Sequence, residues 1–160
     1  MKYFTYDLIS TMNHGGLNRE IIEEAEQQWN DNGSLYWKSY KNLINRLPTH
    51  IYNRFIKFGF HDYELEKLTI DHISLFNTNI DLILTDERKL WKLSFDDIQT
   101  FKFKHLYQNS YRIFAPTTDS WLQEEFLSVD DETISFEVLF SSGANIQIYF
   151  KDKNIKMEQL

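Results

Sequence analysis

The chain has 160 residues, no cysteine and a formal net charge of −7. Its length fits one folded domain, and the lack of cysteine excludes disulfides, thiolate metal sites and a cysteine nucleophile. No apolar run approaches the roughly 20 residues of a membrane span, and the opening residues lack the long apolar core of a signal peptide. We therefore expect a single cytoplasmic domain, 1–160, with no membrane partner.

Residues 1–59 have the apolar spacing of amphipathic helices. The pattern predicts a short helix over 6–12, capped by Thr5, and a second helix that begins at the N-cap Asn18. Turn-forming residues at 30–33 predict the end of that helix, with Ser34 capping the next one. Pro48 suits the first turn of a further helix that ends at Gly59.

After Gly59 the apolar period changes from helical to two, which indicates strands. The expected strands cover 62–71 with a bulge, 80–84, 91–95 with a continuation or bend through 98–103, 121–129, 134–140, 146–150 and the tail from 151. Residues 105–120 are expected to be irregular. Helices followed by strands predict the α+β class, with a helical part over 1–59. An antiparallel meander of five to seven strands should then occupy 60–160, with one face covered by the helices.

Charge is unevenly distributed along the chain. Residues 1–59 hold 7 Lys/Arg and 6 Asp/Glu, whereas residues 60–160 hold 10 and 18, a balance of −8. An acidic sheet surface of this kind favours a basic protein partner, because complementary charge speeds association. The alternative is nucleic-acid binding through the basic 35–58 segment, which holds Lys38, Lys41, Arg46, Arg54 and Lys57 among aromatic residues. The acidic total repels phosphates at long range and disfavours nucleic acid.

The pair His61–Asp62 is the strongest candidate for a metal site. Adjacent His and Asp residues bind metal in the HD-type phosphohydrolases, where they lie on helices. Here the pair opens a predicted strand, so backbone hydrogen bonds at a helix–strand junction are the favoured role. A metal-dependent hydrolase that uses His61 and Asp62 stays an alternative function.

Three carboxylate runs offer a second possible chemistry, because hydrolases can use two carboxyl groups with separated pKa values. They are Asp96–Asp97, Glu124–Glu125 and Asp130–Asp131–Glu132. Neighbouring strand residues point to opposite faces, so solvated acids are the favoured interpretation. The candidate binding residues are Asp96, Asp97, Asp119, Trp121, Asp130 and Asp131.

The sequence contains no nucleophile elbow, Walker loop or dinucleotide fingerprint. No catalytic residue and no cofactor are therefore assigned. We expect a non-enzymatic protein that binds an unidentified, basic protein partner.

Two stretches resemble known bacterial proteins. The opening, Met1-Lys2-Tyr3-Phe4-Thr5 with Asp7 and Leu8, is similar to the start of the DUF4085 family of Firmicutes proteins of unknown function. The stretches Leu47-Pro48, Phe60-His61-Asp62 and 93–98 resemble a wider group of small α+β proteins, some of them similar to immunity proteins of toxin systems. The resemblance implies a bacterial cytosolic protein with a binding role, and it carries over no catalytic residue.

Overall fold

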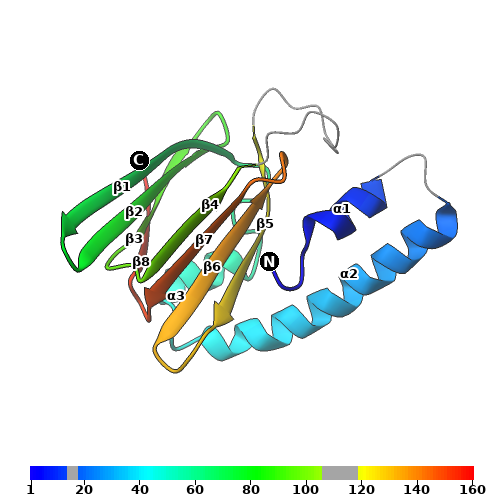
Figure 1. Ribbon diagram of the computed structural model, residues 1–160, viewed down its shortest axis with the longest axis horizontal. Helices are drawn as coiled ribbons and strands as arrows, with labels where there is room; N and C mark the ends of the chain where they lie inside the picture. Colours follow the sequence, from blue (N-terminus) through cyan, green and yellow to red (C-terminus); the bar gives the residue numbers. More distant parts are fainter. Residues whose placement is uncertain (14–17, 106–118) are drawn as a thin grey trace.

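The computed structural model describes residues 1–13, 18–105 and 119–160. Within these ranges, helices come first and strands follow (Figure 1). The helices are α1 (Tyr6–Asn13), α2 (Arg19–Tyr40), the 3₁₀ helix η1 (Lys41–Leu43) and α3 (Thr49–Phe55). The strands are β1 (Glu64–Ser74), β2 (Asn77–Thr85), β3 (Leu90–Phe95), β4 (Thr100–Lys104), β5 (Trp121–Ser128), β6 (Thr133–Phe140), β7 (Asn145–Lys151) and β8 (Ile155–Gln159).

The eight strands of the described ranges form two antiparallel sheets, which confirms the α+β class and exceeds the expected five to seven strands. Sheet A has the order β1-β2-β3-β8, and sheet B has the order β4-β7-β6-β5. The stretch 98–103 neither continues nor bends β3 within its sheet, because β4 pairs with β7 in sheet B. Among the described strands that follow β4, it is β8 that returns to sheet A, where it pairs with β3.

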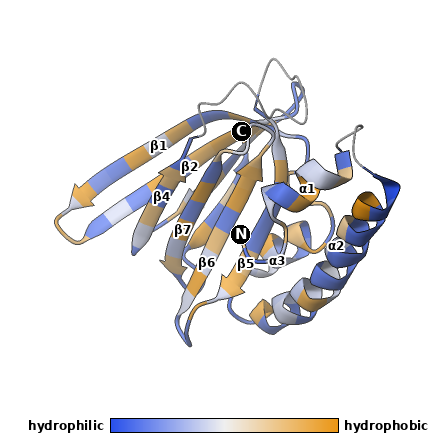
Figure 2. Cartoon of the chain, turned by 45° about the vertical axis from the view of Figure 1, so that its right-hand side comes forward, coloured by the Kyte–Doolittle hydropathy of each residue, from blue (hydrophilic) through white to orange (hydrophobic). Residues whose placement is uncertain are grey.

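Aromatic side chains join the two sheets and the helices in one core. Phe95 of sheet A lies 5.1 Å, centre to centre, from the ring of Phe136 in sheet B. On the helical side, Phe55 of α3 and Tyr40 of α2 both contact Phe126 of β5. Hydrophobic and polar residues alternate along the strands, as Figure 2 shows, so each strand gives one face to this core.

Helix α2 corrects the predicted helix end at residues 30–33, because it continues through this cluster to Tyr40. Polar side chains of this cluster find partners in the folded chain: Ser34 Oγ donates to the Asn30 carbonyl within the helix, and Asn32 Nδ2 donates to the Tyr3 carbonyl of the N-terminal segment at 2.8 Å. Gly33 faces the Phe4 ring. These tertiary contacts outweigh the cost of about 1 kcal/mol for glycine in a helix. The segment Ser34–Tyr40 is therefore part of one long helix.

Strand β1 confirms the predicted bulge. Its pairing with β2 shifts register between Leu65 and Lys67, where the apolar alternation of the sequence changes phase. The expected strands 134–140 and 146–150 are also present as β6 and β7, which pair antiparallel across a tight turn. Most of the 105–120 segment, predicted to be irregular, lies outside the described residues. Across the described ranges, no helix is both long enough and apolar enough to cross a lipid bilayer.

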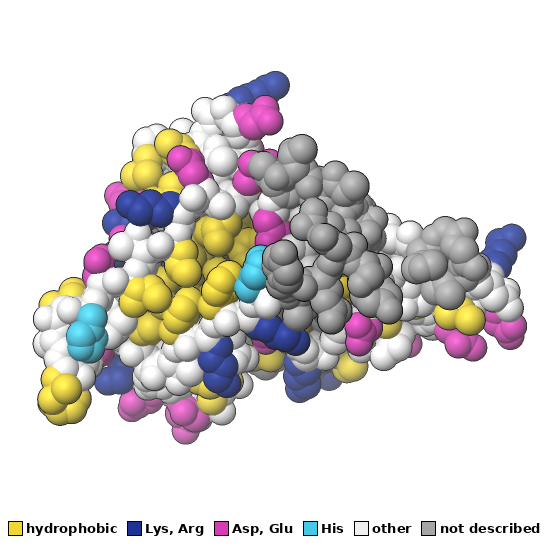
Figure 3. Space-filling model, turned by 45° about the horizontal axis from the view of Figure 1, so that its top comes forward, with side chains coloured by type: hydrophobic (Ala, Val, Ile, Leu, Met, Phe, Trp, Pro, Cys, Tyr) yellow, Lys and Arg dark blue, Asp and Glu magenta, His cyan; other side chains and the backbone are white. Residues whose placement is uncertain are grey.

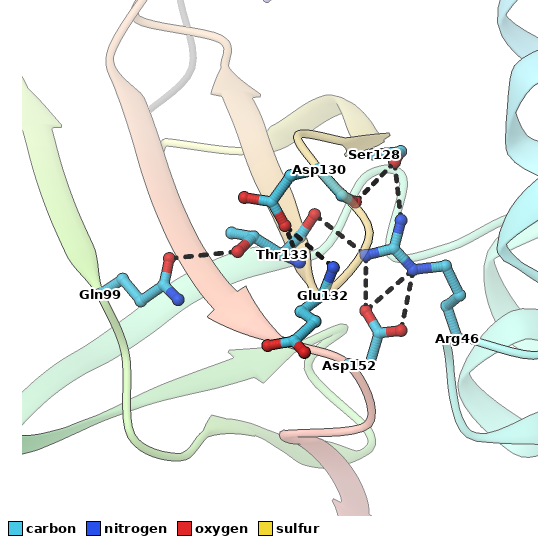
Figure 4. Close-up of polar contacts among 7 residues, drawn as sticks. All are labelled: Arg46, Gln99, Ser128, Asp130, Glu132, Thr133 and Asp152. Carbon is cyan, nitrogen blue, oxygen red and sulfur yellow. Dashed lines mark hydrogen bonds and ion pairs between the residues drawn. The ribbon is translucent and has the colours of Figure 1, made fainter.

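Arg46 fastens the helical part to two turns of the sheets (Figure 4). Its Nε donates to both carboxylate oxygens of Asp152, at 2.9 and 2.8 Å, and its Nη1 donates to Ser128 Oγ. Its Nη2 donates to the Thr133 carbonyl. The hydrogen bonds that Arg46 donates to Asp152, and then the charge of Asp152, raise the pKa of Arg46. One cation thus holds the β5–β6 and β7–β8 turns together.

We expect Arg46→Ala to lower the free energy of unfolding by about 2 kcal/mol, because several charge-assisted hydrogen bonds are lost at a half-buried site. Urea unfolding at neutral pH measures the difference. Arg19→Ala is the matched control, since Arg19 makes a single exposed ion pair with Glu23 and should change stability by less than about 0.5 kcal/mol. Equal losses in the two variants would contradict a fastening role for Arg46.

Candidate functional site

Sheet A presents a charged surface on the side that faces away from sheet B. Strand alternation sends Leu82, Leu93 and Ile155 into the core, so their neighbours point outward. The outward side chains surround a shallow depression of about 310 Å³. We call this surface the acidic face. Its lining consists of Asp71, Asn79, Asp81, Lys92, Ser94, Asp96, Lys156, Met157 and Glu158.

Four carboxylates and two lysines share the acidic face, so its lining has a formal charge of −2. Lys92 Nζ lies 2.9 Å from Asp81 Oδ2 and 4.0 Å from Glu158 Oε1. The hydrogen bond that Lys92 donates to Asp81, together with the charges of Asp81, Glu158 and Asp71, raises the pKa of Lys92. Lys156 pairs with Asp96. The two lysines do not neutralise all four carboxylates, and the strand register fixes the positions of these side chains.

Of the six candidate binding residues, the structure brings only Asp96 to this face. Asp97 follows it with a backbone φ of 49°, and its N–H donates to Asn79 Oδ1 at 2.9 Å. Its role is therefore to turn the chain away from β3. The sequence analysis did not identify the other acids of this face, Asp71, Asp81 and Glu158. Each is a single acid in a strand with an apolar pattern, and they come together only through the register of the paired strands.

Asp119 fixes the β6–β7 turn. Its Oδ1 accepts from Ser141 Oγ and from the Ser142 N–H, and its Oδ2 accepts from Ser142 Oγ at 2.7 Å. The carboxylate is thus occupied by three hydrogen bonds from the β6–β7 turn. Trp121, two residues later, is fully buried in the core. The structure does not bring either residue to the acidic face.

Asp130 caps the β5–β6 turn. Its Oδ1 accepts from the Glu132 and Thr133 N–H groups at 2.9 and 2.7 Å, and the first of these bonds lowers the pKa of Asp130. Asp131 is exposed at the same turn. Both acids lie on sheet B, apart from the acidic face of sheet A.

The prediction that Glu124 and Glu125 are solvated is wrong. Their exposed fractions are 8% and 1%. Both lie within the expected strand 121–129, which became β5, and neighbouring strand residues point to opposite faces, so one of the two had to face inward. The sequence therefore contained the evidence that one of these glutamates is buried. The burial of the other depends on tertiary contacts.

Glu124 faces the core side of β5. Trp121 Nε1 donates to its Oε2 at 2.5 Å. Burial raises the pKa of Glu124 to about 7, and neither this bond nor the charge of Arg54 offsets the effect. A Cβ at position 59 would lie 2.1 Å from Glu124 Oε1, and Gly59 has φ +52°, so only glycine fits against this carboxyl.

Arg54 lies among aromatic rings beside this carboxyl. Its guanidinium carbon is 4.7 Å from the ring centre of Phe60, 5.2 Å from that of Trp91 and 5.7 Å from that of Tyr63. These cation–π contacts hold the side chain against the protein. Among the residues described, Arg54 Nε is buried without a hydrogen-bond partner.

The basic 35–58 segment is largely built into the fold. Arg46 is engaged with Asp152 and Arg54 with aromatic rings, which leaves Lys38, Lys41 and Lys57 exposed. Most aromatic residues of the segment are buried in the core: Tyr36, Tyr40, Tyr52 and Phe55. They are therefore unavailable for stacking on bases.

His61 and Asp62 contact each other at the junction between α3 and β1. His61 Nδ1 lies 3.0 Å from Asp62 Oδ1, and both side chains are exposed. The Asp62 N–H donates to the Trp121 carbonyl, which agrees with the favoured backbone role. No cluster of three or more His, Asp or Glu side chains with metal-binding geometry occurs in the part of the chain that the structure describes.

No protein-family model matches this chain, and no curated protein matches its sequence. The functional argument therefore depends on the geometry and charge described above.

Proposed function

We propose that the protein is a non-enzymatic binding module that holds a basic segment of a protein partner on its acidic face. The observation that carries the proposal is the gathering of Asp71, Asp81, Asp96 and Glu158 around one depression on the outward side of sheet A. A cytosolic role of the immunity type, in which the protein neutralises another protein by binding it, would use such a surface.

Charge and rigidity both suit this function. The acidic side chains stand on paired strands, so their spacing is fixed before a partner arrives and little ordering entropy is lost on binding. Complementary charge on a basic partner raises the association rate and orients the encounter. Lys92 and Lys156 neutralise Asp81 and Asp96 in the free protein, which leaves Asp71 and Glu158 as the acids best placed to pair with a partner.

A fluorescently labelled octalysine peptide tests the surface directly. We expect the double variant Asp71→Asn/Glu158→Gln to weaken peptide binding about tenfold, or 1.4 kcal/mol, in anisotropy titrations at low salt. The matched control is Asp131→Asn/Glu132→Gln, which removes the same charge from the exposed β5–β6 turn and should change affinity by less than about twofold. Equal effects, or a larger effect in the control, would contradict the assignment of the acidic face.

A further inference from the structure

Among the described residues, strand β1 has one edge that is unpaired along most of its length. β2 pairs with one side of it from Glu64 to Ser74. On the other side, the described chain makes backbone contacts only at the start, where Glu64 bridges to Ser120 and the Trp121 N–H donates to the Tyr63 carbonyl. An open strand edge is a template for a further strand. β1 contains no proline or glycine that would interrupt such pairing.

Exposed apolar side chains lie on β1 and at the end of the β1–β2 hairpin. Ile70 is 50% exposed, and Leu75 and Phe76 at the end of the β1–β2 hairpin are 79% and 87% exposed. Figure 3 shows hydrophobic side chains gathered on this side of the molecule and at the hairpin end. Apolar surface concentrated beside an unpaired edge is typical of a contact surface.

The sequence of β1 is complementary to itself when two copies run antiparallel. With a two-fold axis at Thr69, Lys67 of one copy lies opposite Asp71 of the other, and this pair occurs twice. Lys67 and Asp71 both belong to the outward side of sheet A, because they pair with Ile83 and Asn79 of β2. Opposite charges directly across an antiparallel pair stabilise it.

The inward side matches as well. The same axis places Leu68 opposite Ile70 of the second copy, again twice. In the single chain these residues pair with Leu82 and Ile80 in the core layer of sheet A. The apolar layer would therefore continue across the axis, and the half-exposed Ile70 would gain apolar contacts.

Other registers lose this match. Opposed residues must share a face, so the axis moves by whole residues. An axis at Leu68 or Ile70 places both charges opposite uncharged residues. An axis at Lys67 or Asp71 places like charges opposite each other, which is destabilising. Only the axis at Thr69 satisfies both faces of the strand.

We propose that a second copy of this chain pairs with β1 about a two-fold axis at Thr69, joining the two copies of sheet A into one continuous sheet. In the free chain, Lys67 makes no ion pair with any described residue. In the dimer it pairs with Asp71 of the other copy at the edge of the acidic face, so a second copy and a basic partner would compete for this carboxylate. The dimer does not depend on the proposed binding function.

Charge swaps test both the dimer and its register. Analytical ultracentrifugation of the unaltered chain should show a reversible monomer–dimer equilibrium. Lys67→Asp and Asp71→Lys each create two repulsive pairs, and each should weaken dimerisation at least about tenfold. An equimolar mixture of the two variants should dimerise again, because every opposed pair is then attractive. Recovery in the mixture also shows that both variants are folded.

Lys151→Asp is the matched control, since Lys151 is exposed at the end of β7 in the other sheet. It should leave the dimer dissociation constant unchanged within about twofold. A monomer across the whole concentration range would overturn the proposal. The pairing at Thr69 would be overturned if the single variants dimerised as tightly as the unaltered chain. It would also be overturned if the mixture dimerised no more tightly than the single variants.

Discussion

Glu124→Gln is expected to raise the free energy of unfolding at pH 8 by about 3 kcal/mol. The carboxyl is buried beside Gly59 and Trp121, and burial raises its pKa from 4.5 to about 7. Above pH 7 the folded protein must hold a buried negative charge, whereas the unfolded chain solvates it. Glutamine keeps an oxygen that accepts from Trp121 Nε1 and removes the charge. The difference of about 2.5 pKa units corresponds to about 3 kcal/mol.

The sign of the pH dependence follows from proton binding. Between pH 4.5 and 7 the folded state retains the Glu124 proton and the unfolded state has lost it. The contribution of this group to stability is therefore fully present below pH 4.5 and is lost as the pH rises to 7. The advantage of Glu124→Gln over the unaltered chain should grow across that interval and stay constant above it.

Urea unfolding from pH 5 to pH 8.5 measures this difference between the two proteins. Glu132→Gln is the control, because Glu132 is exposed at the β5–β6 turn; its profile should run parallel to that of the unaltered chain. A Glu124→Gln profile that also ran parallel would contradict the raised pKa.

Glu125→Ala is expected to lower the free energy of unfolding by about 4 kcal/mol. The Glu125 carboxylate is 1% exposed and accepts three backbone N–H groups, those of Lys2, Tyr3 and Phe4, at 2.7–2.8 Å. Hydrogen bonds to a charged acceptor contribute about 1.5–3 kcal/mol each and are not additive. Without the carboxylate, three donors would lose their partner and the first residues would detach from β5.

Glu125→Gln removes the charge of the side chain while keeping its size and one acceptor oxygen, so it separates the effect of the charge from that of the shape. Its single carbonyl oxygen can replace Oε1, which accepts from Tyr3 and Phe4, so we expect about half of the loss. Hydrogen exchange at the Tyr3 and Phe4 amides provides the local measurement. Exchange should accelerate strongly in the alanine variant and moderately in the glutamine variant. Unchanged exchange in both would show that other contacts hold the N-terminal segment.

Local patterns predicted the elements of this fold but not how the sheets are assembled. The phase change at Leu65 predicted the bulge, and the alternation at 134–140 predicted β6, because both signals belong to neighbouring residues. The placement of β4 beside β7 depends on pairing across a long stretch of chain. Helix α2 passed through residues 30–33 because Asn32 and Gly33 contact Tyr3 and Phe4, which lie far away in sequence.

The acidic face shows the same limit. The charge balance of residues 60–160 predicted an acidic sheet, and Asp96 was among the named residues. Asp71, Asp81 and Glu158 come from three other strands and meet only through the register of sheet A. Conversely, the conspicuous acids Asp119 and Asp130 bind turns of the chain itself. The sequence therefore showed that the sheet is acidic. Which acidic side chains gather on one surface depends on the pairing of the strands.

The strand order of sheet A also constrains how the protein folds. β3 has two neighbours, β2 and β8, and β4 to β7 lie between β3 and β8 in the chain. During synthesis sheet A thus stays incomplete until β8 has emerged, and β3 exposes an open edge while sheet B is being formed. Such long-range pairing slows folding and leaves an aggregation-prone edge in the meantime. The final strand completes both the sheet and the face on which Glu158 stands.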